Sequence, residues 1–236
     1  MYNKIKGDDT LNVDFERTLL NESTETIPKE FINQADLYRQ VMQRYYAAIK
    51  QVRTKLEILN DELQVSTRRT PIETIKVRLK SPESIIKKMT KQGLEKTLEN
   101  LDKIGDIAGI RVITTYVDDI YDIASMFLQQ ADVKLLKITD YIKKPKESGY
   151  RSLHLDIETP IYFSKERVMV KVEVQIRTIA MDFWASLEHD MKYKVIINGA
   201  EDLKQELKSC ADDISKIDIK MQNIKRKLRE LEDEVI

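Results

Sequence analysis

The chain has 236 residues, of which 42% are hydrophobic and 34% are charged, and its 40 basic residues balance 40 acidic ones. This balance excludes a generally basic nucleic-acid-binding protein, while local charged patches stay open. Cys210 is the single cysteine, so no intramolecular disulfide can form, and a reducing cytoplasmic compartment is expected. Residues 1–29 are polar and aperiodic, and we predict a tail that is neither a signal peptide nor a membrane helix.

The N-terminal helical segment, residues 30–70, is predicted to form one long helix from about residue 31 to residue 64. A helix that packs its apolar face on its own domain explains the pattern, and a partner helix from another chain is the alternative. Apolar or aromatic residues recur there in alternating steps of four and three, at Tyr38, Met42, Tyr45, Ile49, Val52, Leu56, Leu59 and Leu63.

The middle of the chain, residues 71–197, alternates predicted strands and helices. Ser81 followed by proline predicts a helix N-cap, and Asp118 and Asp119 could cap a second helix. The order of elements predicts an α+β fold with a mixed, roughly five-stranded sheet flanked by helices. Alternating or β-branched runs predict strands near residues 74–80, 110–116, 133–141, 152–160 and 168–178.

Residues 198–236 carry the most regular apolar pattern of the chain. Apolar residues surrounded by charges recur in steps of four and three, which is typical of a coiled coil. A contact between copies of the chain is one interpretation, and a hairpin with the N-terminal helix is the other. The seam consists of Leu203, Leu207, Cys210, Ile214, Ile217, Met221, Ile224, Leu228, Leu231 and Val235.

Basic residues follow the first predicted strand, beside the N-terminus of a helix. Positive charge, free backbone N–H groups and the helix dipole together favour phosphate binding there, and a solvated helix face is the alternative. The basic residues are Arg78, Lys80, Lys87 and Lys88, and Ser84 lies among them.

Asp106 lies among small and apolar residues directly before a predicted strand. A buried carboxylate is costly unless it holds a metal or another cation. Arg111 alternates with Ile110 and Val112, so we predict that it projects from the opposite strand face, where it could stack on a purine. A structural ion pair between Asp106 and Arg111 is the alternative.

Residues 134–151 contain six basic and two acidic residues, and the segment KESGYRSLH at 146–154 leads into a strand. Dense lysines beside an aromatic ring suit a polyphosphate with a base stacked on the ring, and a solvated turn is the alternative. The polar residues concerned include Lys143, Lys144, Lys146, Tyr150, Arg151 and His154.

Glu173, Gln175 and Arg177 alternate with apolar residues, so they share one face of a predicted strand. Because a core strand should be covered, we interpret this face as a site. Asp106 and Glu173, surrounded by cations, are the groups that phosphoryl transfer needs, with the carboxylates holding Mg²⁺. A P-loop and a GxGxxG motif are both absent from the sequence.

Four motifs, in this order, resemble the synthetase domain of RelA/SpoT-type alarmone enzymes, in particular the stand-alone small alarmone synthetases. The resemblance covers about residues 74–194 and implies a nucleotidyltransferase-like sheet. It also implies transfer of the β,γ-pyrophosphate of ATP to the 3′-hydroxyl of GDP or GTP, which makes the stringent-response alarmones ppGpp and pppGpp. The motifs are VRLKSPESIIKKM, IGDIAGIRV, DYIKKPKESGYRSLHL and VEVQIRTIAMDFWASLEHDMKYK.

The resemblance implies roles for the matching residues on the ATP side. Arg78 and Arg111 would sandwich the adenine, while Lys80, Ser84 and Lys88 would hold the ATP phosphates.

It also implies roles at the reacting centre and on the acceptor side. Asp106 would bind Mg²⁺, and Glu173 would be a second ligand or a base on the 3′-hydroxyl. Tyr150 would stack on guanine. The other acceptor-binding residues would be Lys143, Lys146, His154, Gln175 and Arg177.

Two departures from the family pattern limit the prediction. Residues 137–140 read KITD, which matches neither the acidic nor the basic version that tracks acceptor choice, so GDP or GTP stays open. His154 and His189 are the only histidines, too few for the family's metal-dependent hydrolase, so no hydrolase activity is expected. The resemblance implies a homotetramer. A nucleotidyltransferase that adds AMP and a non-catalytic RNA-binding module remain alternatives, and nucleic acid is otherwise not an expected partner.

Overall fold

The computed structural model describes residues 35–198 and 201–233, so the predicted tail of residues 1–29 lies outside the described part. A five-stranded sheet with the order β1-β2-β5-β4-β3 forms the centre. The pair β2–β5 is parallel and the other pairs are antiparallel, which confirms the predicted α+β class with a mixed sheet. The strands are β1 (Ile72–Leu79), β2 (Ala108–Thr114), β3 (Lys134–Asp140), β4 (Leu153–Tyr162) and β5 (Arg167–Thr178).

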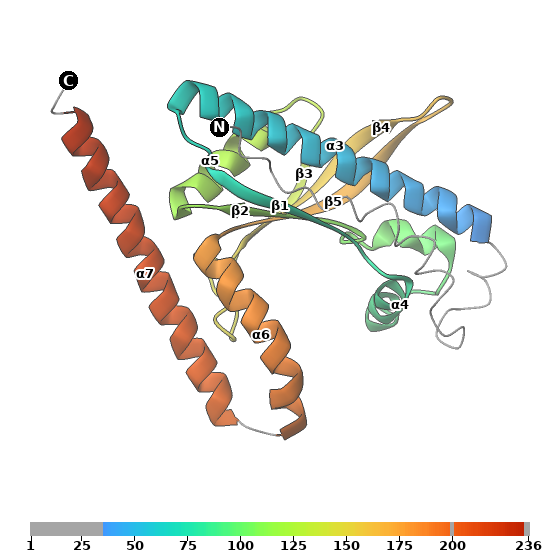
Figure 1. Ribbon diagram of the computed structural model, residues 1–236. Coiled ribbons are helices and arrows are strands. Elements are labelled where there is room, and N and C mark those ends of the chain that lie inside the picture. The colour runs from blue at the N-terminus through green and yellow to red at the C-terminus, as the bar shows by residue number, and fades with distance from the viewer. Residues whose placement is uncertain (1–34, 199–200, 234–236) are drawn as a thin grey trace.

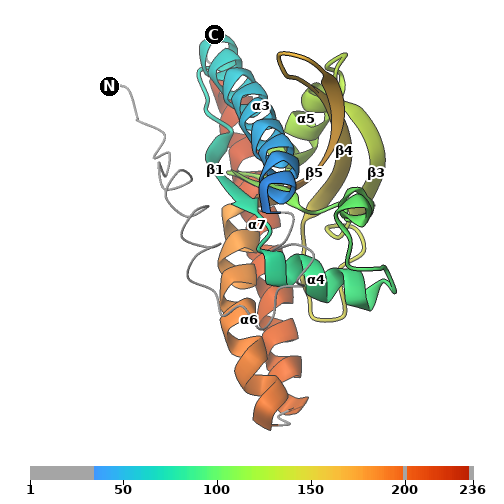
Figure 2. The same ribbon diagram turned by 90° about the vertical axis from the view of Figure 1, so that its right-hand side faces the viewer.

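Helices lie on both sides of this sheet (Figures 1 and 2). Helices α3 and α5 cover one face, while α4 and α6 lie toward the other, and α7 runs beside α6 and reaches α5. Within the described residues, no helix is both long and apolar enough to cross a membrane. The helices are α3 (Ala35–Thr67), α4 (Pro82–Lys91), the 3₁₀ helix η2 (Leu98–Lys103), α5 (Val117–Leu128), α6 (Ile179–Asn198) and α7 (Glu201–Asp233).

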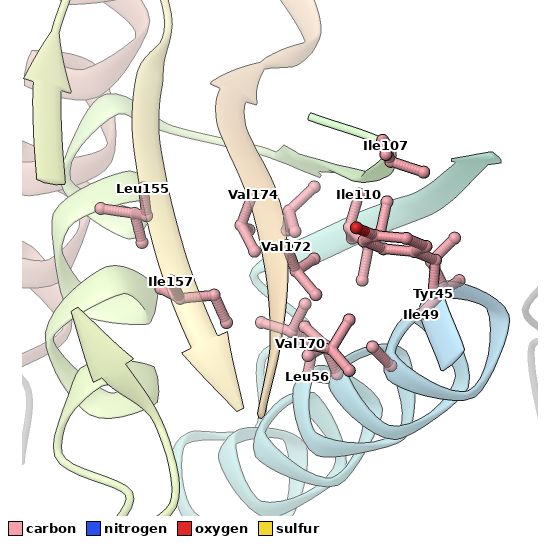
Figure 3. Close-up of a cluster of buried hydrophobic side chains, with 14 of the residues drawn as sticks. Tyr45, Ile49, Leu56, Ile107, Ile110, Leu155, Ile157, Val170, Val172 and Val174 are labelled. Carbon is pink, nitrogen blue, oxygen red and sulfur yellow. The ribbon is translucent and has the colours of Figure 1, made fainter. Parts of the chain in front are cut away.

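The core forms where α3 packs on the sheet (Figure 3). The stripe predicted for this helix is buried from Tyr38 to Leu59, and it contacts strand residues such as Ile110 and Val172. Burial of each such side chain contributes about 1.5–3 kcal/mol. The stripe therefore packs on its own domain, and the alternative of a partner helix at this face is wrong.

Local capping sets the first residue of two helices. Ser81 is the N-cap of α4, as predicted, and its Oγ accepts a hydrogen bond from the backbone N–H of Ser84 at 3.4 Å. At α5 the prediction is confirmed in part, because Asp119 belongs to a capping box but is not the N-cap residue. Tyr116 is the N-cap, and Asp119 lies inside the first turn, where its Oδ2 accepts from the Tyr116 N–H at 3.2 Å. Asp118 likewise belongs to the helix rather than preceding it.

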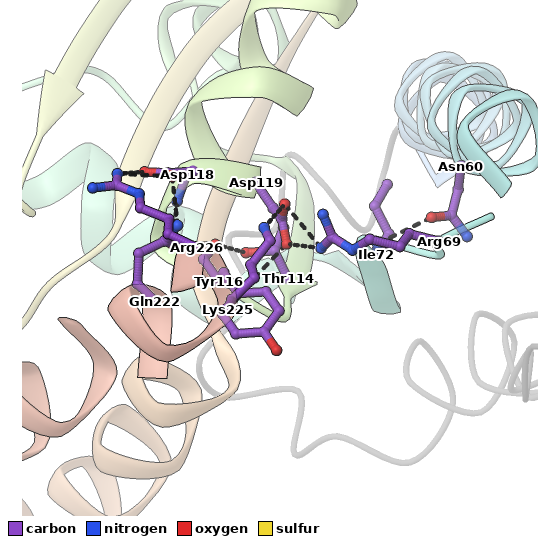
Figure 4. A network of polar contacts seen from close by, with 10 residues as sticks. All are labelled: Asn60, Arg69, Ile72, Thr114, Tyr116, Asp118, Asp119, Gln222, Lys225 and Arg226. Carbon is purple, nitrogen blue, oxygen red and sulfur yellow. Dashed lines mark hydrogen bonds and ion pairs between the residues drawn. The ribbon is translucent and has the colours of Figure 1, made fainter. Parts of the chain in front are cut away.

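Helix α7 docks on the domain through its polar residues (Figure 4). Asp218, Gln222 and Lys225 are buried, and Lys225 Nζ lies 3.2 Å from Oδ1 of Asp119 on α5. The helix packs against α6 and α5, so the alternative of a hairpin with the N-terminal helix is wrong. The described seam residues that are more than one third exposed are Leu203, Cys210, Ile217, Met221, Ile224, Leu228 and Leu231.

Candidate active site

One face of the sheet carries most of the predicted site residues. Residues in register on neighbouring strands project from the same face. Gln175 of β5 is in register with Arg111 of β2 and His154 of β4, and Glu173, one pleat away, is opposite Asp156 of β4. The intervening residues of these strands are apolar and buried toward α3 and α5. Strand pairing therefore gathers the polar side chains on the sheet face that points away from α3 and α5, which we call the polar face.

Asp106 lies in the turn before β2, between two lysines. Its Oδ2 is 2.6 Å from Lys80 Nζ, and its Oδ1 is 2.8 Å from Lys88 Nζ. Burial raises the pKa of Asp106, but the two ammonium groups outweigh burial, and the pKa lies below its ordinary value. The alternative ion pair between Asp106 and Arg111 is wrong, because lysines neutralise this carboxylate.

Glu173 on β5 is held by two neighbours on the same face. Gln175 Nε2 donates a hydrogen bond to its Oε2 at 2.7 Å, and His154 Nδ1 lies 3.4 Å from its Oε1. Burial raises the pKa of Glu173, but these contacts outweigh burial, and the pKa lies below its ordinary value. Burial and the charge of Glu173 raise the pKa of the facing Asp156. Glu173 is thus an oriented, ionised carboxylate at neutral pH.

Asp182, in the first turn of α6, gathers three cations. Its carboxylate lies 2.9 Å from Lys76 Nζ, 3.0 Å from Arg177 Nη2 and 3.6 Å from Arg111 Nη1. The Nε atoms of Arg111 and Arg177 are buried and have no hydrogen-bond partner among the described residues. Burial and the charge of Arg111 lower the pKa of Arg177. Two neighbouring guanidinium groups with unused donors suit an anionic ligand that supplies acceptor oxygens.

Tyr150 lies in the segment between β3 and β4, residues 141–152, which we call the lysine loop. Its hydroxyl is 3.0 Å from His154 Nε2, and its ring meets the Tyr141 ring edge-on at 6.0 Å. Lys146 Nζ lies 4.6 Å from the centroids of both tyrosine rings. The loop therefore brings aromatic rings and a cation beside the polar face.

Two basic residues of this segment lie away from that cluster. Lys143 Nζ is 3.8 Å from the carboxylate of Asp140 and 5.3 Å from the ring centroid of Tyr121 on α5. Arg151 extends toward α7, where its Nη2 is 2.9 Å from Asp212 Oδ1. The Lys143 side chain is 74% exposed and points toward α5 rather than toward Glu173, and the positive charge of Arg151 is neutralised by α7.

The residues predicted for ATP lie along β1, β2 and α4. Arg78 is exposed on the edge strand β1 and is in register with Gly109, whereas Arg111 is in register with Lys76. The two arginines therefore share one face, offset by one pleat. The hydroxyl of Ser84 is 3.0 Å from that of Ser81 at the start of α4.

Three polar residues of this face were not predicted from the sequence. Asp182 follows Arg177 by five residues in the last of the four motifs, and only tertiary packing turns it toward the arginines. Tyr141 is the last residue of the strand predicted near residues 133–141, where an aromatic residue is common. Asp156 alternates with apolar residues in β4, and this pattern could have placed it on the face of His154.

Two carboxylates of the face, Asp106 and Glu173, could contribute to a magnesium site. Within the described residues, no group of three or more His, Cys, Asp or Glu side chains could hold a metal by itself. Mg²⁺ is commonly held by one or two carboxylates together with substrate phosphates, which fits this donor set. Both carboxylates have a pKa below the ordinary value and are ionised at neutral pH, as a metal ligand must be.

The domain has an α+β fold with a mixed sheet. One face of this sheet carries carboxylates and paired guanidinium groups, with the lysine loop beside it. These groups equip the domain to bind nucleotide phosphates. The family model described as the region found in RelA/SpoT proteins matches residues 77–197. The chain belongs to this family, as the resemblance predicted.

Individual members of this family are similar to the chain in sequence and in structure. The GTP pyrophosphokinase YwaC of Bacillus subtilis (strain 168) is 42% identical over 185 residues, which cover 78% of this chain and 88% of YwaC. The crystal structure of small alarmone synthetase 2 from Bacillus subtilis matches with a TM-score of 0.73 and 40% identity, covering 80% of this chain and 98% of that one. Small alarmone synthetase 1 from Bacillus subtilis, bound to its product pppGpp, matches with a TM-score of 0.75 and 31% identity, covering 82% and 99%.

Proposed function

We propose that the protein transfers the β,γ-pyrophosphate of ATP to the 3′-hydroxyl of GDP or GTP, making ppGpp or pppGpp. The main support for this function is the composition of the polar face. Asp106 and Glu173 provide carboxylates for Mg²⁺, and the Arg111–Arg177 pair provides cations for phosphates. Family membership and the small alarmone synthetase bound to pppGpp support the same reaction.

The reaction forms one bond and breaks one. The 3′ oxygen of the acceptor bonds to the β-phosphorus of ATP, the bond from that phosphorus to the α-phosphate oxygen breaks, and AMP leaves. The hydroxyl proton is released. Arg177 would neutralise phosphate charge as it shifts, and Arg111 would do so while it stacks on the adenine, because each offers a buried Nε–H donor that is unused within the described residues. Lys80 and Lys88 would do the same beside Asp106.

Glu173 and Asp106 would hold Mg²⁺, which supplies charge neutralisation of the transferred phosphates when bound. A general base works best with a pKa near the working pH. The pKa of Glu173 lies below its ordinary value. This favours a role as metal ligand, or as acceptor of a hydrogen bond from the 3′-hydroxyl, over that of a strong base.

An assay with ATP labelled at the γ-phosphate tests the reaction. In the presence of GDP or GTP and Mg²⁺, we expect the label to appear on guanosine and AMP to be released in equal amount. Transfer of AMP with release of pyrophosphate would instead identify a nucleotidyltransferase. Salt-sensitive RNA binding without any nucleotide product would identify an RNA-binding module.

Tyr150→Ala is expected to weaken acceptor binding by about 1–3 kcal/mol, the range typical of base stacking on an aromatic ring. Steady-state kinetics with GDP or GTP varied at saturating ATP measure this effect. Tyr150→Phe removes only the hydroxyl, which is 3.0 Å from His154 Nε2, and should keep the acceptor constant.

Tyr162→Ala is the matched control for this variant, because Tyr162 is 72% exposed at the end of β4. An unchanged acceptor constant in Tyr150→Ala would remove Tyr150 from the acceptor site.

We also propose that copies of the chain associate through the exposed apolar seam of α7, in a homotetramer. Seven described seam residues and an apolar row on α6 (Ile179, Phe183, Leu187 and Met191) are more than one third exposed in the single chain. Contiguous apolar surface of this kind marks interaction sites.

Ile224→Glu combined with Leu228→Glu is expected to reduce the solution mass, measured by light scattering, because charges in an apolar interface are costly to desolvate. Lys220→Glu, an exposed position on the same helix, should keep the wild-type mass. A single-chain mass for the wild type would contradict association through this seam.

A further inference from the structure

The lysine loop is packed directly against the backbone of α7 at Gly149. This glycine has φ +90°, and a Cβ atom placed on it would lie 2.6 Å from the Cβ of Ala211 and 3.6 Å from the Cα of Lys208. A side chain is therefore excluded both by the backbone conformation and by the helix. The main chain of the loop can approach α7 this closely only because residue 149 is glycine.

Arg151 fastens the same part of the loop to α7. Its Nη1 donates to the carbonyl oxygen of Gly149 at 3.0 Å and to that of Ala211 at 3.3 Å. Its Nη2 donates to Oδ1 of Asp212 at 2.9 Å. The Arg151 side chain is 14% exposed, whereas that of Asp212 is 48% exposed, so the guanidinium is largely shielded from water and its carboxylate partner is only half shielded. One guanidinium thus joins the bend of the loop to both the main chain and a side chain of α7.

Tyr150 lies between these two anchored residues and points to the polar face instead. Its ring is near Arg177, whose guanidinium carbon lies 6.0 Å from the ring centroid, and its hydroxyl reaches His154. Because both neighbours are fixed to α7, the main chain of Tyr150 has little freedom. Helix α7 therefore fixes the position of the Tyr150 ring indirectly, through the contacts of Gly149 and Arg151.

The anchoring stretch of α7 is itself held to the domain. The indole N–H of Trp184 on α6 donates to the carbonyl oxygen of Leu207 at 3.0 Å, and Trp184 is 5% exposed. Four residues further along α7, Ala211 is buried against the loop. The helix can therefore act as a rigid support for the loop.

We propose that α7 is the back wall of the acceptor site, and that Arg151 and Asp212 are positioning residues that hold Tyr150 in place for the guanine base. This inference rests on the proposed function, because it assigns Tyr150 to the acceptor. Neither residue touches substrate in this role. Both act through the main chain of the lysine loop.

Arg151→Ala is expected to raise the KM for GDP or GTP about tenfold or more, because it removes three hydrogen bonds, one of them to a charged partner. The KM for ATP should stay near the wild-type value, since the ATP-side residues lie on β1, β2 and α4. A general loss of folding would lower the apparent kcat and leave both KM values unchanged, so a rise confined to the acceptor KM separates positioning from a merely structural role.

Asp212→Asn is the second variant, and it removes only the charge of the partly exposed acceptor. We expect a smaller rise in the acceptor KM, about twofold to fivefold, in keeping with an exposed ion pair. Asp213→Asn is the matched control, because Asp213 is the next residue and pairs with Lys216 on the surface of α7 instead of with Arg151. It should leave both KM values unchanged.

The outcomes separate this inference from the proposed function. If the wild type forms no labelled guanosine product, the proposed function fails, and binding of fluorescently labelled GDP to the same variants still tests the positioning role. If the wild type is active but Arg151→Ala and Asp212→Asn keep the wild-type acceptor KM, or change the KM for ATP equally, the inference is wrong. If Arg151→Ala does not fold, Asp212→Asn carries the test.

Discussion

Glu173→Gln is expected to lower the rate of guanosine pyrophosphorylation by at least about 100-fold, the lower range for loss of a catalytic acid–base group. The amide has the same size, and its oxygen can still accept the hydrogen bond from Gln175. It carries no negative charge, however, so it would hold Mg²⁺ less tightly and could not accept the proton of the 3′-hydroxyl. ATP binding should be retained, because the residues predicted for ATP lie on β1, β2 and α4.

Quenched time points of labelled product measure the rate, and equilibrium binding measures ATP affinity. Glu158→Gln is the matched control, since Glu158 lies on the neighbouring strand β4 but pairs with Lys134 of the edge strand β3 at 3.3 Å. Turnover near that of the wild type in Glu173→Gln would show that neither proposed role of this carboxylate is correct.

A magnesium titration of the same variant separates the two roles of Glu173. If the carboxylate is a metal ligand, raising the Mg²⁺ concentration should restore part of the lost rate. If it accepts the hydroxyl proton, the loss should persist at saturating Mg²⁺.

Asp119→Asn is expected to lower the free energy of unfolding by about 3 kcal/mol, as when one partner of a buried ion pair is removed. Asp119 is 4% exposed, and its carboxylate lies 2.9 Å from Arg69 Nη2 and 3.2 Å from Lys225 Nζ (Figure 4). Asparagine can still accept the N-cap hydrogen bond from Tyr116. The lost free energy of unfolding would therefore come from Arg69 and Lys225, which no longer have a negative partner.

Urea denaturation at a fixed protein concentration measures this effect. Asp213→Asn is the control, because both members of the pair Asp213–Lys216 are more than 60% exposed, and such pairs contribute less than about 1 kcal/mol. Combining Asp119→Asn with Lys225→Met should recover part of the stability, since the buried charge is removed along with its partner. A loss below about 1 kcal/mol in the single variant would contradict a stabilising role for this network.

Local periodicity in the sequence is enough to determine several features of this protein. The steps of four and three from Tyr38 to Leu59 predicted the buried face of α3, because a helix repeats every 3.6 residues whatever it packs against. Alternation placed Glu173, Gln175 and Arg177 on one face of β5 in the same way. These predictions succeed because they depend on backbone geometry alone.

Ion pairing was decided only by the tertiary structure. Asp106 had many lysines and arginines as eligible partners in the sequence, and distance in space selected Lys80 and Lys88. The same is true of Asp182, which meets Arg177 and Arg111 because α6 begins directly after β5 and also contacts β2. Sequence spacing carries no information on such choices, because the Coulomb energy depends on separation and burial in the folded chain.

The docking of α7 shows the same limit for a whole helix. Its apolar seam from Leu203 to Val235 was visible in the sequence, with Val235 outside the described residues. The described α7 residues that are buried against the domain are nevertheless mainly polar: Asp218, Gln222 and Lys225, together with Ala211. An amphipathic helix offers both faces, and the surface opposite decides which is used. Here the N-terminus of α5 presents acidic side chains, so buried polar contacts fasten α7 to the domain, and through Arg151 the same helix holds the lysine loop.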